Sequence, residues 1–129
     1  WVGMEARVAA PAVFDGSPIT LAPNPVANAD QTRLIVKDAS GNQVQANEIN
    51  MSSEQIEWAG IDQSGNPLPN GTYSFELESL QDGKVLATTP MELYSEIIEV
   101  RGEGGVTVLI TEAGSKVDVT DISAVRRAD

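Results

Sequence analysis

Apolar and polar positions alternate along the chain in short runs, which is the pattern of β-strands. In the clearest run, residues 72–78, the apolar residues Tyr73, Phe75 and Leu77 share one face, opposite a polar face. Comparable extended segments are expected at residues 4–10, 19–21, 32–38, 43–46, 55–58, 85–89, 91–101, 106–111 and 116–119. Glycine and proline fall between these segments, so the chain is predicted to be all-β, as a sandwich or as small barrels.

Two further segments depart from the strand pattern. Pro23 and Pro25 exclude both a helix and a central strand, and they indicate a linker between structural units. Residues 121–127 are expected to form a helical turn, with Asp121 as its N-cap and with Arg126 and Arg127 placed favourably at its C-terminal end.

The charge and composition exclude several kinds of chemistry. The chain carries 8 Lys and Arg against 19 Asp and Glu, a formal charge of −11, and it has no histidine and no cysteine. These absences exclude histidine acid–base catalysis, thiol nucleophiles and Cys/His zinc sites, so neither a cofactor nor an enzymatic activity is expected. The acidic balance argues against nucleic acid and anionic membranes as partners, because both require a basic surface.

The acidic residues have structural interpretations. Glu76 and Glu78 are candidates for a carboxylate pair, but they lie opposite the apolar face of their strand and are expected in solvent. Residues 62–66 resemble the opening of a calcium loop. They lack the later ligands, including a bidentate glutamate, so we interpret them as a turn and predict no metal site.

One constellation stands out between residues 58 and 73. Trp58 is expected to pack in the core, and Leu68 is expected to fill the loop. Gly71 is expected to have a positive φ, and Tyr73 is expected to begin the inward face of the next strand. This arrangement predicts a structural corner rather than a catalytic site. The full motif is Trp58, Gly60, Asp62, Gly65, Leu68, Pro69, Gly71 and Tyr73.

This motif resembles that of the flagellar hook-capping proteins, also called basal-body rod modification or hook assembly proteins. Residues 2–8 resemble the segment that precedes the folded region in that family, although Met4 stands where a basic residue is usual. Residues 94–100 resemble its return strand, and residues 105–110 and 117–125 its closing hairpin and terminal turn. The resemblance covers essentially the whole chain.

The resemblance implies an architecture and a role. A fibronectin type III-like sandwich at residues 22–90 is expected to be inserted into a small Tudor-like barrel formed by residues 1–21 and 91–129. The implied function is a scaffold that caps the distal end of the growing flagellar hook and promotes polymerisation of exported hook subunits. Expected partners are the hook subunit, the rod tip and further copies of the cap. The implied location is the hook tip, after export directed by an N-terminal region that would precede residue 1.

A second function from a different class remains open at this point. The same corner motif occurs in other bacterial fibronectin-like repeats, so the chain also fits an adhesion or binding module of a larger extracellular protein. Repeated copies of the Trp58 motif and a signal peptide in the parent gene would favour adhesion, whereas neighbouring hook and rod genes would favour hook capping.

Overall fold

The structure, a computed structural model, describes residues 1–51 and 54–127, so the end of the expected barrel segment at 128–129 lies outside it. No helix long and apolar enough to cross a membrane occurs in this part of the chain. The predicted all-β class is confirmed. The strands are β1 (Met4–Val8), β2 (Ala12–Phe14), β3 (Ile19–Ala22), β4 (Gln31–Lys37), β5 (Gln43–Ile49), β6 (Ile56–Trp58), β7 (Gly71–Gln81), β8 (Lys84–Pro90), β9 (Glu92–Glu103), β10 (Val106–Thr111), β11 (Lys116–Asp118) and β12 (Ala124–Arg127).

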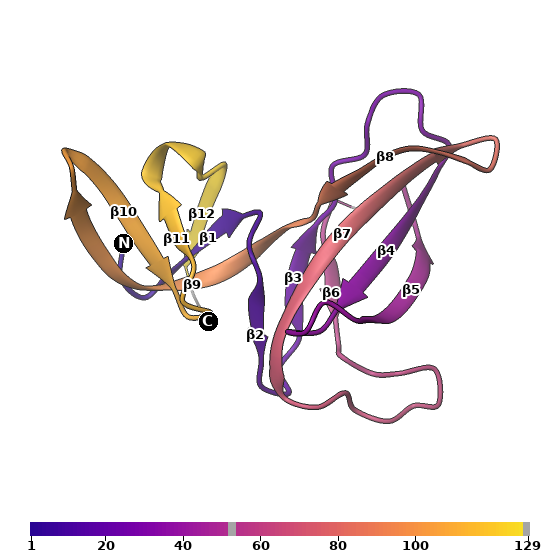
Figure 1. Cartoon of the computed structure of the whole chain (residues 1–129), viewed down its shortest axis with the longest axis horizontal. Helices are drawn as coiled ribbons and strands as arrows, with labels where there is room; N and C mark the ends of the chain where they lie inside the picture. Colours follow the sequence, from indigo (N-terminus) through magenta and orange to yellow (C-terminus); the bar gives the residue numbers. More distant parts are fainter. Residues whose placement is uncertain (52–53, 128–129) are drawn as a thin grey trace.

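A five-stranded sheet is built around the long strand β7. Its order is β2-β7-β4-β5, with β8 also hydrogen-bonded to β7. Residues 71–73 of β7 pair with β2 and residues 76–81 pair with β8, whereas β4 pairs along residues 74–80. Strands β2 and β8 therefore follow one another along one edge of β7, with β2 beside its lower part and β8 beside its upper part in Figure 1.

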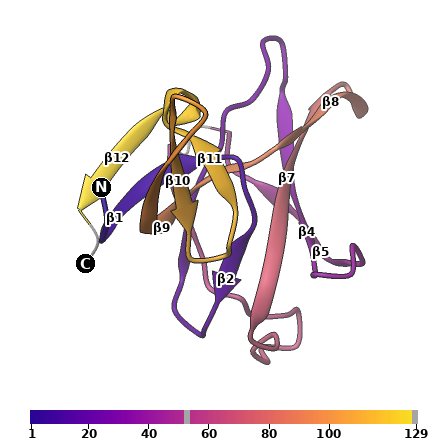
Figure 2. The same ribbon diagram turned by 60° about the vertical axis from the view of Figure 1, so that its left-hand side comes forward.

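The second sheet passes through β9. At residues 92–93 this strand pairs with β3, which in turn pairs with β6, and at residues 93–96 it pairs with β1, which pairs with β12. Its second half, residues 97–103, pairs with β10 and curls away with β11. Figure 2 shows β1 and β9 to β12 gathered on one side of the molecule. Strand β9 therefore links everything on the left of Figure 1 to the strands on the right.

We describe β2 to β8 as a sandwich unit and β1 with β9 to β12 as a curled unit, although β3 also pairs with β9, so the two units share one sheet. The expected boundary at residues 21 and 22 does not coincide with a change of partner, because β2 pairs with β7 and β3 pairs with β6. Pro23 and Pro25 lie between β3 and β4, within the sandwich unit, and the chain passes between the units at residues 9–11 and at Pro90–Met91. The division into two domains stays a prediction, now with residues 12–22 assigned to the sandwich.

The expected helical turn at 121–127 is wrong. A single 3-10 turn, η1 (Val119–Asp121), comes earlier, and its N-cap is Asp118, whose carboxylate accepts from the Thr120 amide at 2.9 Å. Residues 124–127 then extend as β12 and pair with β1. A helix of seven residues is marginal in water, whereas the free edge of β1 offers a full set of backbone hydrogen bonds.

The core follows the alternation in the sequence. In β7 the side chains of Tyr73, Phe75 and Leu77 are buried, as predicted, and they belong to one core cluster with buried residues of β3, β4 and β6. The core continues without a break into the curled unit. There it consists of Ala6, Val8, Leu93, Ile97 and Leu109.

The curled unit is expected to fold without the sandwich. Val8 and Leu93 are cross-strand partners, so a short glycine-rich turn from Val8 to Glu92 can replace residues 9–91. We expect the product to keep β-sheet circular dichroism and slow amide exchange in β1, β9 and β10. An unfolded product with two different turn designs would show that the core of this unit is too small to stand alone.

Candidate functional site

Trp58, the first residue of the sequence motif, lies at the end of β6 and is buried, with 5% of its surface exposed. Its indole Nε1 donates to Oε1 of Gln45 on β5 at 2.8 Å, and Nε2 of the same glutamine donates to the Ile61 carbonyl at 2.9 Å. Gln45 thus satisfies the polar atom of the buried indole and holds the loop that follows. Sequence analysis did not single out Gln45, because nothing in its own segment marks it.

The ring of Trp58 is the centre of an aromatic cluster. It lies 5.2 Å from Phe14, 5.4 Å from Tyr73 and 5.0 Å from Phe75, measured between ring centroids. The contacts with Phe14 and Phe75 are edge-to-face, a geometry that adds about 0.5–1.5 kcal/mol per pair beyond burial. The cluster joins β2, β6 and β7, and so connects the two sheets of the sandwich unit.

The glycine that the corner requires is Gly60. It has a φ of 70°, and a Cβ there would overlap the ring of Phe14. Gly71, for which a positive φ was predicted, has a φ of 158°, at the border of the extended region, and no atom lies within 4 Å of a Cβ built on it. The close approach of Phe14 is a tertiary contact, so the spacing of glycines in the motif did not reveal it.

The remaining motif residues shape the loop between β6 and β7. The Asp62 carboxylate accepts from the amides of Ser64 and Asn66, each at 2.9 Å, which makes this segment the turn that the sequence predicted. The Leu68 amide donates to the Gly60 carbonyl at 2.8 Å, and the Leu68 side chain packs against the core.

Tyr73 closes the corner. Its hydroxyl donates to the carbonyl oxygen of Pro69 at 2.6 Å, four residues upstream at the entrance to β7. This contact matches the tyrosine corner of immunoglobulin-like sandwiches. Burial, and secondarily the charge of Asp38, raises the pKa of the Tyr73 phenol above its usual value, so the hydroxyl stays a donor. The contacts at the corner support its structural interpretation.

Glu76 and Glu78 lie on the outer face of β7, as predicted, but each has a cation partner on β4. Lys37 Nζ is 2.8 Å from Glu76 and Arg33 Nη1 is 3.1 Å from Glu78. These half-exposed cross-strand pairs contribute at most about 1 kcal/mol each. Their geometry indicates sheet stabilisation and gives no support to a catalytic pair.

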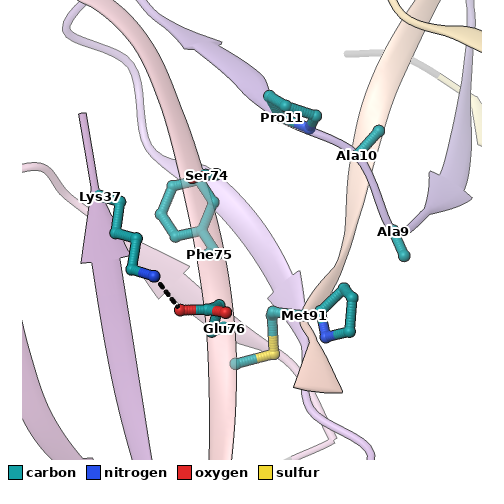
Figure 3. A pocket seen from close by; sticks show the side chains of 9 residues that line it. Ala9, Ala10, Pro11, Lys37, Ser74, Phe75, Glu76 and Met91 are labelled. Atoms are coloured by element: carbon teal, nitrogen blue, oxygen red, sulfur yellow. Dashed lines mark ion pairs between the residues drawn. The ribbon is translucent and has the colours of Figure 1, made fainter. Parts of the chain in front are cut away.

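A shallow pocket of about 240 Å³ lies where the two units meet (Figure 3). Residues 9–11 form one wall, and the side chains of Phe75 and Met91 lie opposite, with the Lys37–Glu76 ion pair to one side. Most of this lining is apolar, and its two charged residues, Lys37 and Glu76, are paired with each other. The arrangement is suited to contact with another side chain.

A polar network crosses the sheet that the two units share. On β12, Arg126 donates through Nε to Glu5 at 2.6 Å and through Nη2 to the Thr20 hydroxyl at 2.8 Å, and its guanidinium lies 4.1 Å from the centre of the Tyr94 ring. Arg7 and Glu92 pair beside it at 3.0 Å. Sequence analysis missed this network, because Arg126 is 121 positions from Glu5 and 106 from Thr20.

The network borders an acidic cleft of about 270 Å³ between the units. Four carboxylates line the cleft, Glu5, Asp15, Glu96 and Glu112, and Arg126 is the cation among its lining residues. Burial, and then the charges of Glu96, Asp15 and Glu5, raises the pKa of Glu112 above its ordinary value. Ionisation of Glu112 near neutral pH therefore lowers the stability of the folded state, and this loss is relieved in acid, where the carboxyl group is protonated.

Taken together, these features define a class: an all-β module in which a Trp-centred sandwich is joined through a shared sheet to a small curled unit. The sequence profile described as "FlgD Ig-like domain" matches residues 9–83, more than half of the chain. The chain therefore belongs to the FlgD Ig-like domain family.

Solved structures of FlgD proteins share the fold over both units. FlgD of Pseudomonas aeruginosa is 24% identical with a TM-score of 0.75, and the match covers 95% of this chain and 96% of that one. FlgD of Xanthomonas campestris, described for its hook capping in flagellar assembly, is 16% identical with a TM-score of 0.72, covering 98% and 94%. A comparison with curated proteins finds no match.

The aromatic cluster gives a direct test of the structural interpretation of the motif. Trp58→Ala is expected to lower the free energy of unfolding by about 3–5 kcal/mol, because it leaves a cavity and an unpaired Gln45 amide. Chemical denaturation measures the change. Trp1→Ala is the matched control, since Trp1 is 49% exposed and its loss is expected to cost less than about 0.5 kcal/mol. Equal costs for the two variants would contradict a structural role for Trp58.

Proposed function

We propose that this chain works in the cap at the distal end of the growing flagellar hook, as a scaffold on which exported hook subunits polymerise. The observation that carries the proposal is membership of the FlgD family, with a fold likeness that extends over nearly the full length of FlgD structures. The proposed location is the tip of the hook, outside the cell.

The distribution of contacts supports a scaffold. The motif residues are used in packing and turn geometry, and the pockets offer apolar and acidic contact surfaces without an activated nucleophile. A cap holds subunits in place for polymerisation and needs no covalent chemistry. The alternative role, as an adhesion module, is favoured by none of the comparisons.

Proposed partners are the hook subunit, the rod tip and other copies of the cap. Six of the eight basic residues are engaged in ion pairs within the described part of the chain: Arg7, Arg33, Lys37, Arg101, Lys116 and Arg126. Most of the excess carboxylates therefore present unneutralised charge at the surface. Such a surface favours partners with basic contact faces and opposes contact between copies of this chain alone.

Deletion of the coding region for residues 1–129 in the source bacterium tests the function. We expect loss of hooks by electron microscopy and release of unpolymerised hook subunit into the medium, since subunits would leave the growing end unassembled. Reintroducing the intact region is the control and is expected to restore hooks. Hooks of normal number and length in the deletion strain would contradict the proposal.

The charge balance predicts weak self-association of residues 1–129 alone. At low salt we expect a monomer or weak oligomer by light scattering, because the net charge of −11 opposes close contact. Near 0.15 M salt the Debye length falls to about 8 Å and the repulsion relaxes. A tight oligomer that is independent of salt would place the main assembly contacts within this chain.

A further inference from the structure

Arg126 connects the two units through its side chain. It belongs to β12 at the outer edge of the curled unit, and its Nη2 donates to the hydroxyl of Thr20 on β3, in the sandwich unit, at 2.8 Å. Its Nε is held by Glu5 at 2.6 Å, and its plane rests on the Tyr94 ring. A planar guanidinium with several donors suits this bridging position, because it hydrogen-bonds in two directions while it stacks.

The acceptor of this bridge is itself fixed. Thr20 is 5% exposed, and its hydroxyl donates to Glu57 on β6 at 2.7 Å while it accepts from Arg126. The hydrogen bonds therefore run from Glu5 through Arg126 and Thr20 to Glu57, across four strands of the shared sheet. If the curled unit moves relative to the sandwich unit, Thr20 does not move with Arg126, because its hydrogen bond to Glu57 holds it in the sandwich unit.

The backbone pairing across the joint is short. Between β3 and β9 the backbone pairing consists of Leu21 with Leu93 and Ala22 with Glu92. The chain crosses between the units at residues 9–11 and 90–91. The buried core also runs between the units, but apolar contact is not directional, so resistance to bending and twisting depends on directional contacts such as these two backbone pairs and the hydrogen bond of Arg126.

Arg126 also supplies positive charge to the acidic cleft. Without it, Asp15 of the sandwich unit would face Glu5, Glu96 and Glu112 of the curled unit across the cleft, with no cation among the residues that line it. Repulsion between these carboxylates would push the units apart, and partial burial of the cleft weakens its screening by salt.

We propose that Arg126 acts as a clasp that fixes the placement of the curled unit relative to the sandwich unit, through its contact with Thr20. Loss of the clasp frees the joint while each unit keeps its own fold. The clasp thereby sets the angle between the curled unit and the sandwich unit, and with it the relative orientation of their exposed surfaces.

The absence of cysteine makes the test direct, because labels attach only where cysteines are introduced. Val44→Cys on β5 and Val106→Cys on β10 place spin labels on exposed positions in different units. Double electron–electron resonance then measures the distance distribution between them. We compare the labelled parent with Arg126→Ala, with Thr20→Val, and with Arg127→Ala. The last is the matched control, which removes an equal charge from an exposed neighbour on the same strand.

We expect a single narrow distribution for the parent and for Arg127→Ala, and a distribution about twice as wide for Arg126→Ala and Thr20→Val. Amide NMR spectra establish that each unit stays folded. If Arg126→Ala unfolds the curled unit, the width measured for Thr20→Val is the test of the proposal. This variant keeps the Glu5–Arg126 pair and nearly the same side-chain shape. A parent-like width in Thr20→Val, or in folded Arg126→Ala, would overturn the proposal.

Discussion

The first residues of β9 connect the sandwich unit to the curled unit, because they pair with β3 on one side and with β1 on the other. Leu93 is fully buried and is paired across the sheet with Val8 on one side and with Leu21 on the other. Its neighbours along the strand, Glu92 and Tyr94, point to the opposite face, where they contact Arg7 and Arg126. Because side chains alternate along a strand, one short stretch supplies both the continuous core and the polar network that connect the two units.

The sandwich unit depends on a second constraint, the packing around Trp58. Strand β6 has only three residues and pairs with β3, so few backbone hydrogen bonds hold it. The ring contacts with Phe14, Tyr73 and Phe75, together with the hydrogen bond to Gln45, fix the position of the strand. The packing of the motif residues thus stabilises the sandwich unit.

The distribution of charge fits a protein whose activity is assembly. Basic side chains are used mainly within the molecule, in pairs such as Lys37–Glu76 and Arg33–Glu78 that align neighbouring strands. The remaining carboxylates give the net charge of −11 from which weak association between copies is predicted. Under the proposed function, specific association uses partner surfaces that neutralise this charge, which is how electrostatic complementarity selects among partners.

The sequence by itself determined the class of the fold and the local geometry of the corner. Alternation at residues 72–78 predicted which side chains of β7 are buried, and the Asp62 turn follows from a side chain bonding to amides two and four residues away. The tertiary structure decided the rest. Residues 124–127 became a strand because β1 offered an unpaired edge, and Gly60 is needed because Phe14 arrives from β2. The contact of Arg126 with Thr20 joins positions 106 residues apart. Periodicity fixes which face of a strand is apolar, but it carries no information on which strand lies alongside, so contacts between distant segments are set only when the whole core forms.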